Sequence, residues 1–241
     1  MRTEVDRLEK RIRERFVKAF VTYHLIENGD HILVALSGGK DSLCLLEMLG
    51  KRAKIEKPQF KVEAIHVRME NIAYETSTDY LQRFCDDLGV PLHVITTSFE
   101  PSDQKPPCFL CSWNRRKQMF NLAQELGCNK IALGHHQDDL LHTSMMNLFY
   151  QGRFDTMPAL LKMRKMPLSI IRPLCLVEET DIRRYAELRG YEKQVKLCPY
   201  EKDSHRDDMR ILFENIQKQN PEARHSLWNA LVRADKLVDI S

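Results

Sequence analysis

Short apolar runs alternate with longer segments of helical periodicity through most of the chain. The apolar runs predict strands at residues 31–36, 61–67, 92–97, 130–135 and 168–174. Apolar residues at helical spacing predict helices at residues 42–53, 75–88, 112–126, 138–150 and 179–189. This alternation favours an α/β fold with a doubly wound, mostly parallel sheet. Ligands of such sheets bind where the strands reach their carboxyl ends.

Helical patterns also flank the alternating region. Residues 4–27 repeat apolar side chains at helical spacing, and the following Asn28-Gly29 is a favourable helix end. Near the other end of the chain only helical patterns remain, at 206–219 and 222–236. We therefore predict three parts: an N-terminal basic helix in 1–29, an α/β domain in 30–200 and a C-terminal helical extension in 201–241.

Composition narrows the class of protein. The chain has 241 residues, of which 43% are hydrophobic and 29% charged, and this balance is typical of a globular protein. A net charge of +3 does not by itself argue for a polyanionic partner. The chain shows neither a secretory h-region nor an 18-residue apolar run, so we expect a cytoplasmic protein without a membrane span. Seven cysteines in that compartment are expected to be thiols or metal ligands.

The stretch "SGGKDS", residues 37–42, follows a predicted strand and opens a predicted helix. Unpaired backbone N–H groups and the helix dipole favour an anion at such a position. Gly38 and Gly39 let the backbone approach a phosphate, while Ser37, Lys40 and Ser42 could donate hydrogen bonds to it. Asp41 lies in the first helical turn and could help to hold Mg²⁺. The stretch matches S-G-G-x-D-S, the signature of the PP-loop ATP pyrophosphatases, which implies a grip on the pyrophosphate of ATP.

The cysteines suggest a second chemical centre. Cys108 and Cys111 form a C-x-x-C motif in "PPCFLCSWNRRK", where the two prolines predict an extended approach to a helix that begins near the second cysteine. Nearby cations and the helix N-terminus would favour thiolates, which suit metal ligation or redox chemistry. A dithiol, half of a zinc site and part of an iron–sulfur cluster all remain open. Cys198, followed by a proline as cluster ligands often are, is the favoured third ligand, and Cys175 is its rival.

A third polar segment, "GHHQDD", spans a strand end and a helix start. It brings His135, His136, Asp138 and Asp139 together in sequence at the edge of the sheet where the glycine-rich stretch also lies. The alternative interpretation is that this segment is only an ordinary helix N-terminus, where acids are common in the first turn.

Taken together, these motifs resemble the tRNA 2-thiocytidine synthetases, a branch of the PP-loop ATP pyrophosphatases. The matching segments are "LSGGKDSL", "CFLCSWNRR", "KIALGHHQDD", "NLFYQGRFDTMPALL" and "IRPL…E..DI". They span roughly residues 31–185, which is most of the chain.

The resemblance implies ATP, Mg²⁺ and a [4Fe-4S] cluster, held by three cysteines so that the fourth iron can carry sulfide. The implied ATP-binding residues are Ser37, Gly38, Gly39, Lys40, Asp41, Ser42, Gly134, His135 and Asp138. Magnesium would be held by Asp41 and Asp138, and the cluster by Cys108, Cys111 and Cys198. Asp41 and these three cysteines are the expected catalytic residues.

The family chemistry is ATP-dependent replacement of the C2 oxygen of cytidine 32 in tRNA by sulfur. The implied partners are tRNA and a sulfur donor, either a cysteine desulfurase or sulfide, and the resemblance also allows a homodimer. Basic stretches agree with an RNA substrate. Residues 1–20 contain seven Lys or Arg against four acids. Residues 151–174 contain Arg153, Lys162, Arg164, Lys165 and Arg172 against the single acid Asp155.

Two other functions are compatible with the residues. One is a different PP-loop RNA-modifying enzyme that holds zinc at the same cysteines. The other is a non-enzymatic protein that binds nucleotide and tRNA around a structural metal site.

Overall fold

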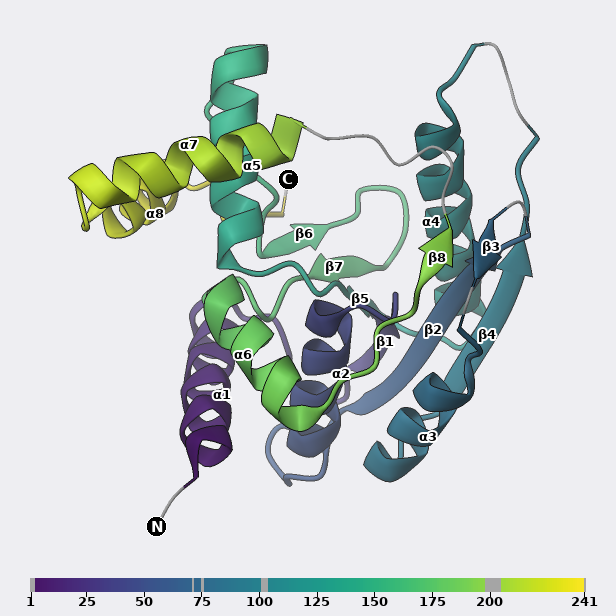
Figure 1. Ribbon diagram of the computed structural model, residues 1–241. Helices are drawn as coiled ribbons and strands as arrows, with labels where there is room; N and C mark the ends of the chain where they lie inside the picture. Colours follow the sequence, from purple (N-terminus) through teal and green to yellow (C-terminus); the bar gives the residue numbers. More distant parts are fainter. Residues whose placement is uncertain (1–2, 71, 75, 101–103, 198–204, 241) are drawn as a thin grey trace.

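A seven-stranded sheet forms the centre of the computed structural model, which describes residues 3–70, 72–74, 76–100, 104–197 and 205–240 (Figure 1). Its strand order is β4-β2-β1-β5-β7-β6-β9. The bounds are β1 His31–Ala35, β2 Lys61–Met69, β4 Leu92–Thr97, β5 Lys130–Ala132, β6 Leu160–Lys162, β7 Ser169–Ile171 and β9 Val238–Asp239. Neighbouring strands are parallel except for β6 and β7. The predicted α/β class with a mostly parallel sheet is confirmed.

Helices cover both faces of this sheet, as a doubly wound fold requires. Their bounds are α1 Glu4–Thr22, α2 Lys40–Ala53, α3 Asp79–Leu88, α4 Pro107–Glu125, α5 Gln137–Gln151, α6 Glu179–Arg189, α7 His205–Gln219 and α8 Ala223–Arg233. Alternate residues of β1 separate the two cores: Ile32 and Val34 pack with α1, α2 and α6, whereas Leu33 packs with Leu122 of α4. The sheet is thus buried on both faces, which explains the unbroken apolar runs of its central strands.

The sheet reverses its order between β1 and β5. From β1 the chain proceeds outward to β2 and β4, whereas β5 begins the other half, towards β7. Crevices at such reversal points are the usual ligand sites of open α/β sheets. The glycine-rich stretch follows β1 and the "GHHQDD" stretch follows β5, so both lie at this reversal point.

The terminal helices pack onto the core. Helix α1 contacts α6, and α7 contacts α5 (Figure 1). The prediction that 201–241 contain only helices is wrong, because β9 pairs with β6 in the main sheet. The proposed division at residues 29 and 200 remains a prediction. None of the described helices has the length and apolar character needed to cross a membrane.

A small two-stranded sheet lies apart from the main one. It pairs β3 (Ala73–Tyr74) with β8 (Lys196–Leu197) in antiparallel orientation. The sequence did not indicate either strand, because two-residue strands carry no detectable periodicity. We call residues 73–77 and 194–197, apart from the undescribed position 75, the strap.

Candidate active site

The glycine-rich stretch forms a turn that is braced by its own hydroxyls. The Oγ of Ser37 accepts a hydrogen bond from Gly39 N at 3.3 Å and donates to the Oγ of Ser42 at 3.1 Å. Ser42 in turn donates to the carbonyl of Gly39, the N-cap of α2, at 2.9 Å. This loop is held in place before any ligand arrives.

Gly38 is required at its position for two independent reasons. Its φ is +84°, a conformation that favours glycine, and a Cβ there would lie 2.2 Å from Cγ of Gln194. The backbone N–H of Gln194 donates to the carbonyl of Gly38 at 3.1 Å. The Gly38 position therefore serves contact with the strap as well as the phosphate approach that the sequence suggested.

Gln194 is itself fixed by the other half of the strap. Its Oε1 accepts from the hydroxyl of Thr76 at 3.0 Å, and its Nε2 donates to the carbonyl of Ser77 at 2.7 Å. Val195 N also donates to the Thr76 hydroxyl at 3.0 Å. Nothing in the local sequence marks Gln194 or Thr76 as site residues, and sequence reasoning missed both.

Lys40 and Asp41 begin α2 beside the loop. Lys40 Nζ lies 3.2 Å from Asp41 Oδ2 and 3.1 Å from Glu179 Oε1 on α6. Burial alone would lower the pKa of Lys40, but the adjacent carboxylates outweigh it and raise that pKa, so the ammonium stays charged. The other oxygen of Asp41, Oδ1, is buried and accepts no hydrogen bond from the described residues.

The loop after β5 packs directly against the start of α2. A Cβ on Gly134 would lie 3.0 Å from Ser42 N and 3.1 Å from the carbonyl of Asp41, so only glycine permits this approach. His136 follows and is buried; its Nε2 lies 3.8 Å from Asp41 Oδ1 and 3.5 Å from Asp139 Oδ2. His136 thus belongs to the site more directly than its neighbour His135.

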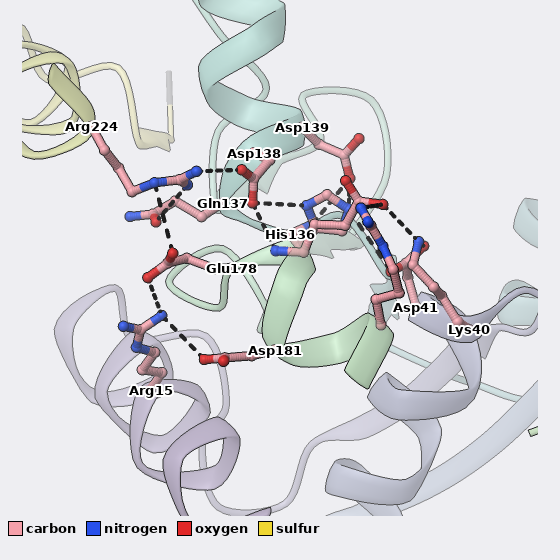
Figure 2. A network of polar contacts seen from close by, with 12 residues as sticks. Arg15, Lys40, Asp41, His136, Gln137, Asp138, Asp139, Glu178, Asp181 and Arg224 are labelled. Carbon is pink, nitrogen blue, oxygen red and sulfur yellow. Dashed lines mark hydrogen bonds and ion pairs between the residues drawn. The ribbon is translucent and has the colours of Figure 1, made fainter. Parts of the chain in front are cut away.

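A chain of polar contacts links His136 to the N-terminal helix α1 and to the C-terminal helix α8, as Figure 2 shows. Asp138 accepts from Arg224 of α8 at 2.6 Å and from the backbone N–H of Glu179 at 2.8 Å. Arg224 also approaches Glu178, which is paired with Arg15 of α1 at 2.7 Å. Burial alone would raise the pKa of Asp138, but the hydrogen bond and charge of Arg224 outweigh it and lower that pKa.

Both oxygens of Asp138 are therefore engaged within the protein. Its predicted role as a magnesium ligand has to compete with these hydrogen bonds, whereas Asp41 keeps one oxygen without such a partner. The geometry identifies Asp138 primarily as the residue that joins α5, α6 and α8.

Arg172 does not lie on the surface, as the RNA-binding prediction for 151–174 requires. It is buried, and burial lowers its pKa to about 10. Its Nε donates to Nδ1 of His135 at 3.3 Å, and its guanidinium also contacts the carbonyl of Pro158. Arg172 therefore holds the loop after β5 in place and is not part of a phosphate-binding surface.

The two cysteines of the C-x-x-C motif lie on the first turns of α4. The helix begins at Pro107, earlier than predicted, because proline is well suited to the first helical position. Cys108 is exposed and Cys111 is half-buried, and one helical turn separates them. Both cysteines therefore belong to the helix, whereas the sequence predicted a helix that begins near the second one.

The strap connects this helix to the glycine loop. Tyr74 of β3 packs against the small core cluster of Met69, Ile72 and Phe99, as Leu110 and Cys111 of α4 also do. The Tyr74 hydroxyl accepts a hydrogen bond from Arg115 of α4 at 3.0 Å. The other end of the strap, at Gln194, contacts Gly38. The two predicted centres are thus bridged by one small sheet.

The candidates for a third ligand have different surroundings. Cys175 is 0% exposed in the main core, and burial raises the pKa of its thiol. Cys198 lies outside the described residues. Among the residues that the structure does describe, no group of three or more His, Cys, Asp or Glu could hold a metal ion.

Comparisons with known proteins agree with this architecture. Residues 7–194 match the family model of the PP-loop domain. A tRNA-cytidine(32) 2-sulfurtransferase of Paraburkholderia phytofirmans is 35% identical over 236 residues, which cover 95% of this chain and 69% of the relative. The enzyme of the same name from Methylococcus capsulatus is 35% identical over 95% of this chain and 81% of its own length.

A solved structure extends the likeness to three dimensions. The U34-tRNA thiolase of Methanococcus maripaludis, determined with its [4Fe-4S] cluster, superposes with a TM-score of 0.76. The match covers 94% of this chain and 78% of that protein at 24% identity, which establishes a shared fold.

Proposed function

The chain belongs to the tRNA-cytidine(32) 2-sulfurtransferases, a family of PP-loop enzymes, and we propose that it replaces the C2 oxygen of cytidine 32 in tRNA by sulfur at the expense of ATP. The observation that carries the proposal is the strap. It is hydrogen-bonded to the glycine loop at Gly38 and to the cysteine helix at Arg115, so ATP chemistry and sulfur delivery would occur on either side of one base.

The nucleotide side fits ATP and Mg²⁺. The loop presents the start of α2 to an anion, and the Lys40 ammonium lies beside it. The buried Oδ1 of Asp41 is an oxygen ligand of the kind that Mg²⁺ prefers, and a metal there would satisfy it. Asp41 is the proposed magnesium ligand, and His136 is positioned to orient its carboxylate.

The cysteine side fits an iron–sulfur cluster. The thiols of Cys108, which is exposed, and Cys111, which is half-buried, lie one helical turn apart. We assign the third ligand to Cys198, because the preceding residue Leu197 pairs with Ala73, next to Tyr74, which packs against the same small cluster as Cys111. Cys175 is unsuitable because core side chains enclose it completely. When bound, the cluster would supply the sulfur that enters the base.

The reaction then has two displacements. The C2 oxygen of the pyrimidine attacks the α-phosphate of ATP, and pyrophosphate leaves as the P–O bond to it breaks. Lys40 and the start of α2 offset the charge that develops on the leaving pyrophosphate. A sulfide next attacks C2, and AMP leaves with the original oxygen. The protein contributes position and charge at both steps.

The decisive experiment compares cysteine variants after anaerobic reconstitution. We expect Cys198→Ala, Cys108→Ala and Cys111→Ala each to lose iron, sulfide and tRNA thiolation together. Cys175→Ala is the matched control and is expected to unfold at a lower temperature while it retains the cluster.

Three results would contradict the assignment. A full cluster in Cys198→Ala would exclude that ligand. Stoichiometric zinc with no visible absorption in the wild-type protein would favour a zinc enzyme. Cluster-loaded protein that forms no AMP, pyrophosphate or thiolated cytidine with tRNA would exclude the proposed activity.

A further inference from the structure

One face of α4 carries exposed aromatic rings between cations. Phe109 is 44% exposed and Trp113 is 48% exposed, and they lie four residues apart on the helix. Arg116 and Phe120 continue the same side, because spacings of three and four residues return to one face. From Phe109 to Phe120 this surface extends about 16 Å along the helix. We call it the α4 aromatic face and include the flanking Lys105 and Lys117.

Phe120, at one end of this face, packs partly against the core, whereas Phe109 and Trp113 are exposed. Among the described residues of α4, only Leu122 and Ala123, near its end, are buried. A hollow of about 340 Å³ opens here, lined by Trp113, Arg116, Lys117, Phe120 and Asn121. Exposed aromatic rings beside a hollow mark a surface that binds something.

The charges on the face indicate what it binds. Residues 104–124 contain Lys105, Arg115, Arg116 and Lys117 and no acid. Within the described part of the chain, Lys105, Arg116 and Lys117 take part in no ion pair with a carboxylate. A polyanion would complement this face, whereas an apolar protein surface would leave three cations facing it without counter-charges.

The lysines already lie over the rings. Lys105 Nζ is 5.3 Å from the centroid of Phe109, and Lys117 Nζ is 5.5 Å from the centroid of Trp113. At an exposed position such a contact is worth only about two- to fivefold in an equilibrium. Stacking of one nucleic-acid base on an aromatic ring is worth about 5- to 150-fold. A base would therefore displace the ammonium group, which would be free to pair with the adjoining phosphate.

We propose that the α4 aromatic face binds unpaired RNA nucleotides, with bases stacked on Trp113 and Phe109 and phosphates paired with Lys105, Arg116 and Lys117. Paired bases are already stacked in a duplex, so only a loop or single strand can use the rings. The face begins next to Cys108, where the sulfur would be held. It would thus hold nucleotides that flank the target base. The proposal rests on the proposed function only in taking RNA as the substrate.

Tryptophan fluorescence gives a direct test, because the chain has only two tryptophans and Trp228 is 8% exposed. The full-length protein is titrated with unmodified tRNA transcript, a single-stranded RNA octamer and a blunt duplex with the same number of phosphates. We expect quenching by the first two and little by the duplex. The Trp113→Phe variant should lose the quenching but keep the affinity.

Measurements of RNA affinity at several salt concentrations distinguish the contribution of base stacking from that of phosphate contacts. Trp113→Ala is expected to weaken octamer and tRNA binding tenfold or more without changing the log–log salt slope. Lys117→Gln should reduce that slope by about one. The matched control is Phe149→Ala, which removes a ring that is 61% exposed on α5 and should leave RNA binding unchanged.

Unchanged RNA affinity in Trp113→Ala, or equal quenching by the duplex, would overturn the proposal even if the enzyme thiolates tRNA normally. If Trp113→Ala binds RNA normally but loses activity only when a protein supplies the sulfur, the face would be assigned to that protein instead. Octamer binding that depends on Trp113 in a protein unable to thiolate tRNA would support the face and refute the proposed function.

Discussion

The two sides of the site are built in opposite ways. On the nucleotide side, the glycine loop is tied by its own serines, by Gln194 and by the close approach of Gly134. Behind it, ion pairs link Asp138 to α8 and Glu178 to α1. On the cysteine side, none of the described residues in the first turns of α4 is buried, and Cys108 is exposed.

This contrast follows from what each side has to hold. A phosphate is gripped by backbone N–H groups and by fixed charges, which act best when they are held in place beforehand. A metal cluster and an RNA loop bring much of their own structure, so the helix that receives them can remain open. The strap joins the rigid nucleotide side to the open cysteine side. Whether a change on one side affects the other can therefore be measured, as ATP turnover and as iron content.

The largest effect is expected from Asp41→Asn. It should lower pyrophosphate formation by about 100- to 1000-fold, because the proposed ligand of the Mg²⁺ that neutralises the reacting phosphates is lost. The thermal unfolding temperature should change little, because Oδ1 of Asp41 accepts no hydrogen bond from the described residues. Lys40, the partner of Oδ2, would keep its ion pair with Glu179. Iron content after reconstitution should equal that of the wild type. A loss of iron would show that the two sides are not independent.

Gly38→Ala tests the strap. The new methyl group would meet Gln194 at 2.2 Å, so either the loop or the strap must move. We expect about a 100-fold loss in kcat/KM for ATP, typical of a displacement of about 1 Å, together with weaker iron retention. Gly29→Ala is the matched control, because Gly29 has a similar φ of +87° with nothing within 4 Å. If both variants behave alike, backbone strain is the whole effect.

Arg224→Ala is expected to have the smallest effect, about tenfold on turnover, with a loss of about 2 kcal/mol in the free energy of unfolding. Asp138 would remain buried without its cation, so its pKa would rise. The pKa of Asp138 in the wild type lies below the usual 3.8, so the carboxylate is charged in both proteins at neutral pH. The difference in unfolding free energy between wild type and variant should therefore be largest there. It should shrink as the pH falls through the region where Asp138 of the variant becomes protonated.

The measurement is urea unfolding of both proteins between pH 7 and pH 4. Arg233→Ala on the same helix is the control, because this residue is exposed. A deficit that does not depend on pH would mean that Arg224 acts through packing and not through Asp138.

Local patterns were sufficient for the sheet class, the order of the main helices and both reactive motifs. A five-residue apolar run, the S-G-G-x-D-S stretch and the C-x-x-C spacing are recognisable within a few residues, because the physics that shapes them acts between near neighbours. The same dependence on local signals explains the errors. The strands β3, β6, β8 and β9 are only two or three residues long, and Pro106-Pro107 was interpreted as an extended approach when Pro107 in fact begins α4.

Only the tertiary structure decided which distant residues meet at the site. Gln194 reaches Gly38, and Arg224 reaches Asp138 from 86 residues away, because the strand order and the packing of α8 bring them there. In the sequence, Arg172 is one cation among basic neighbours, yet the folded chain buries it and its guanidinium donates to His135. Burial and partnership depend on what packs from elsewhere in the chain, and no local pattern of residue types contains that information.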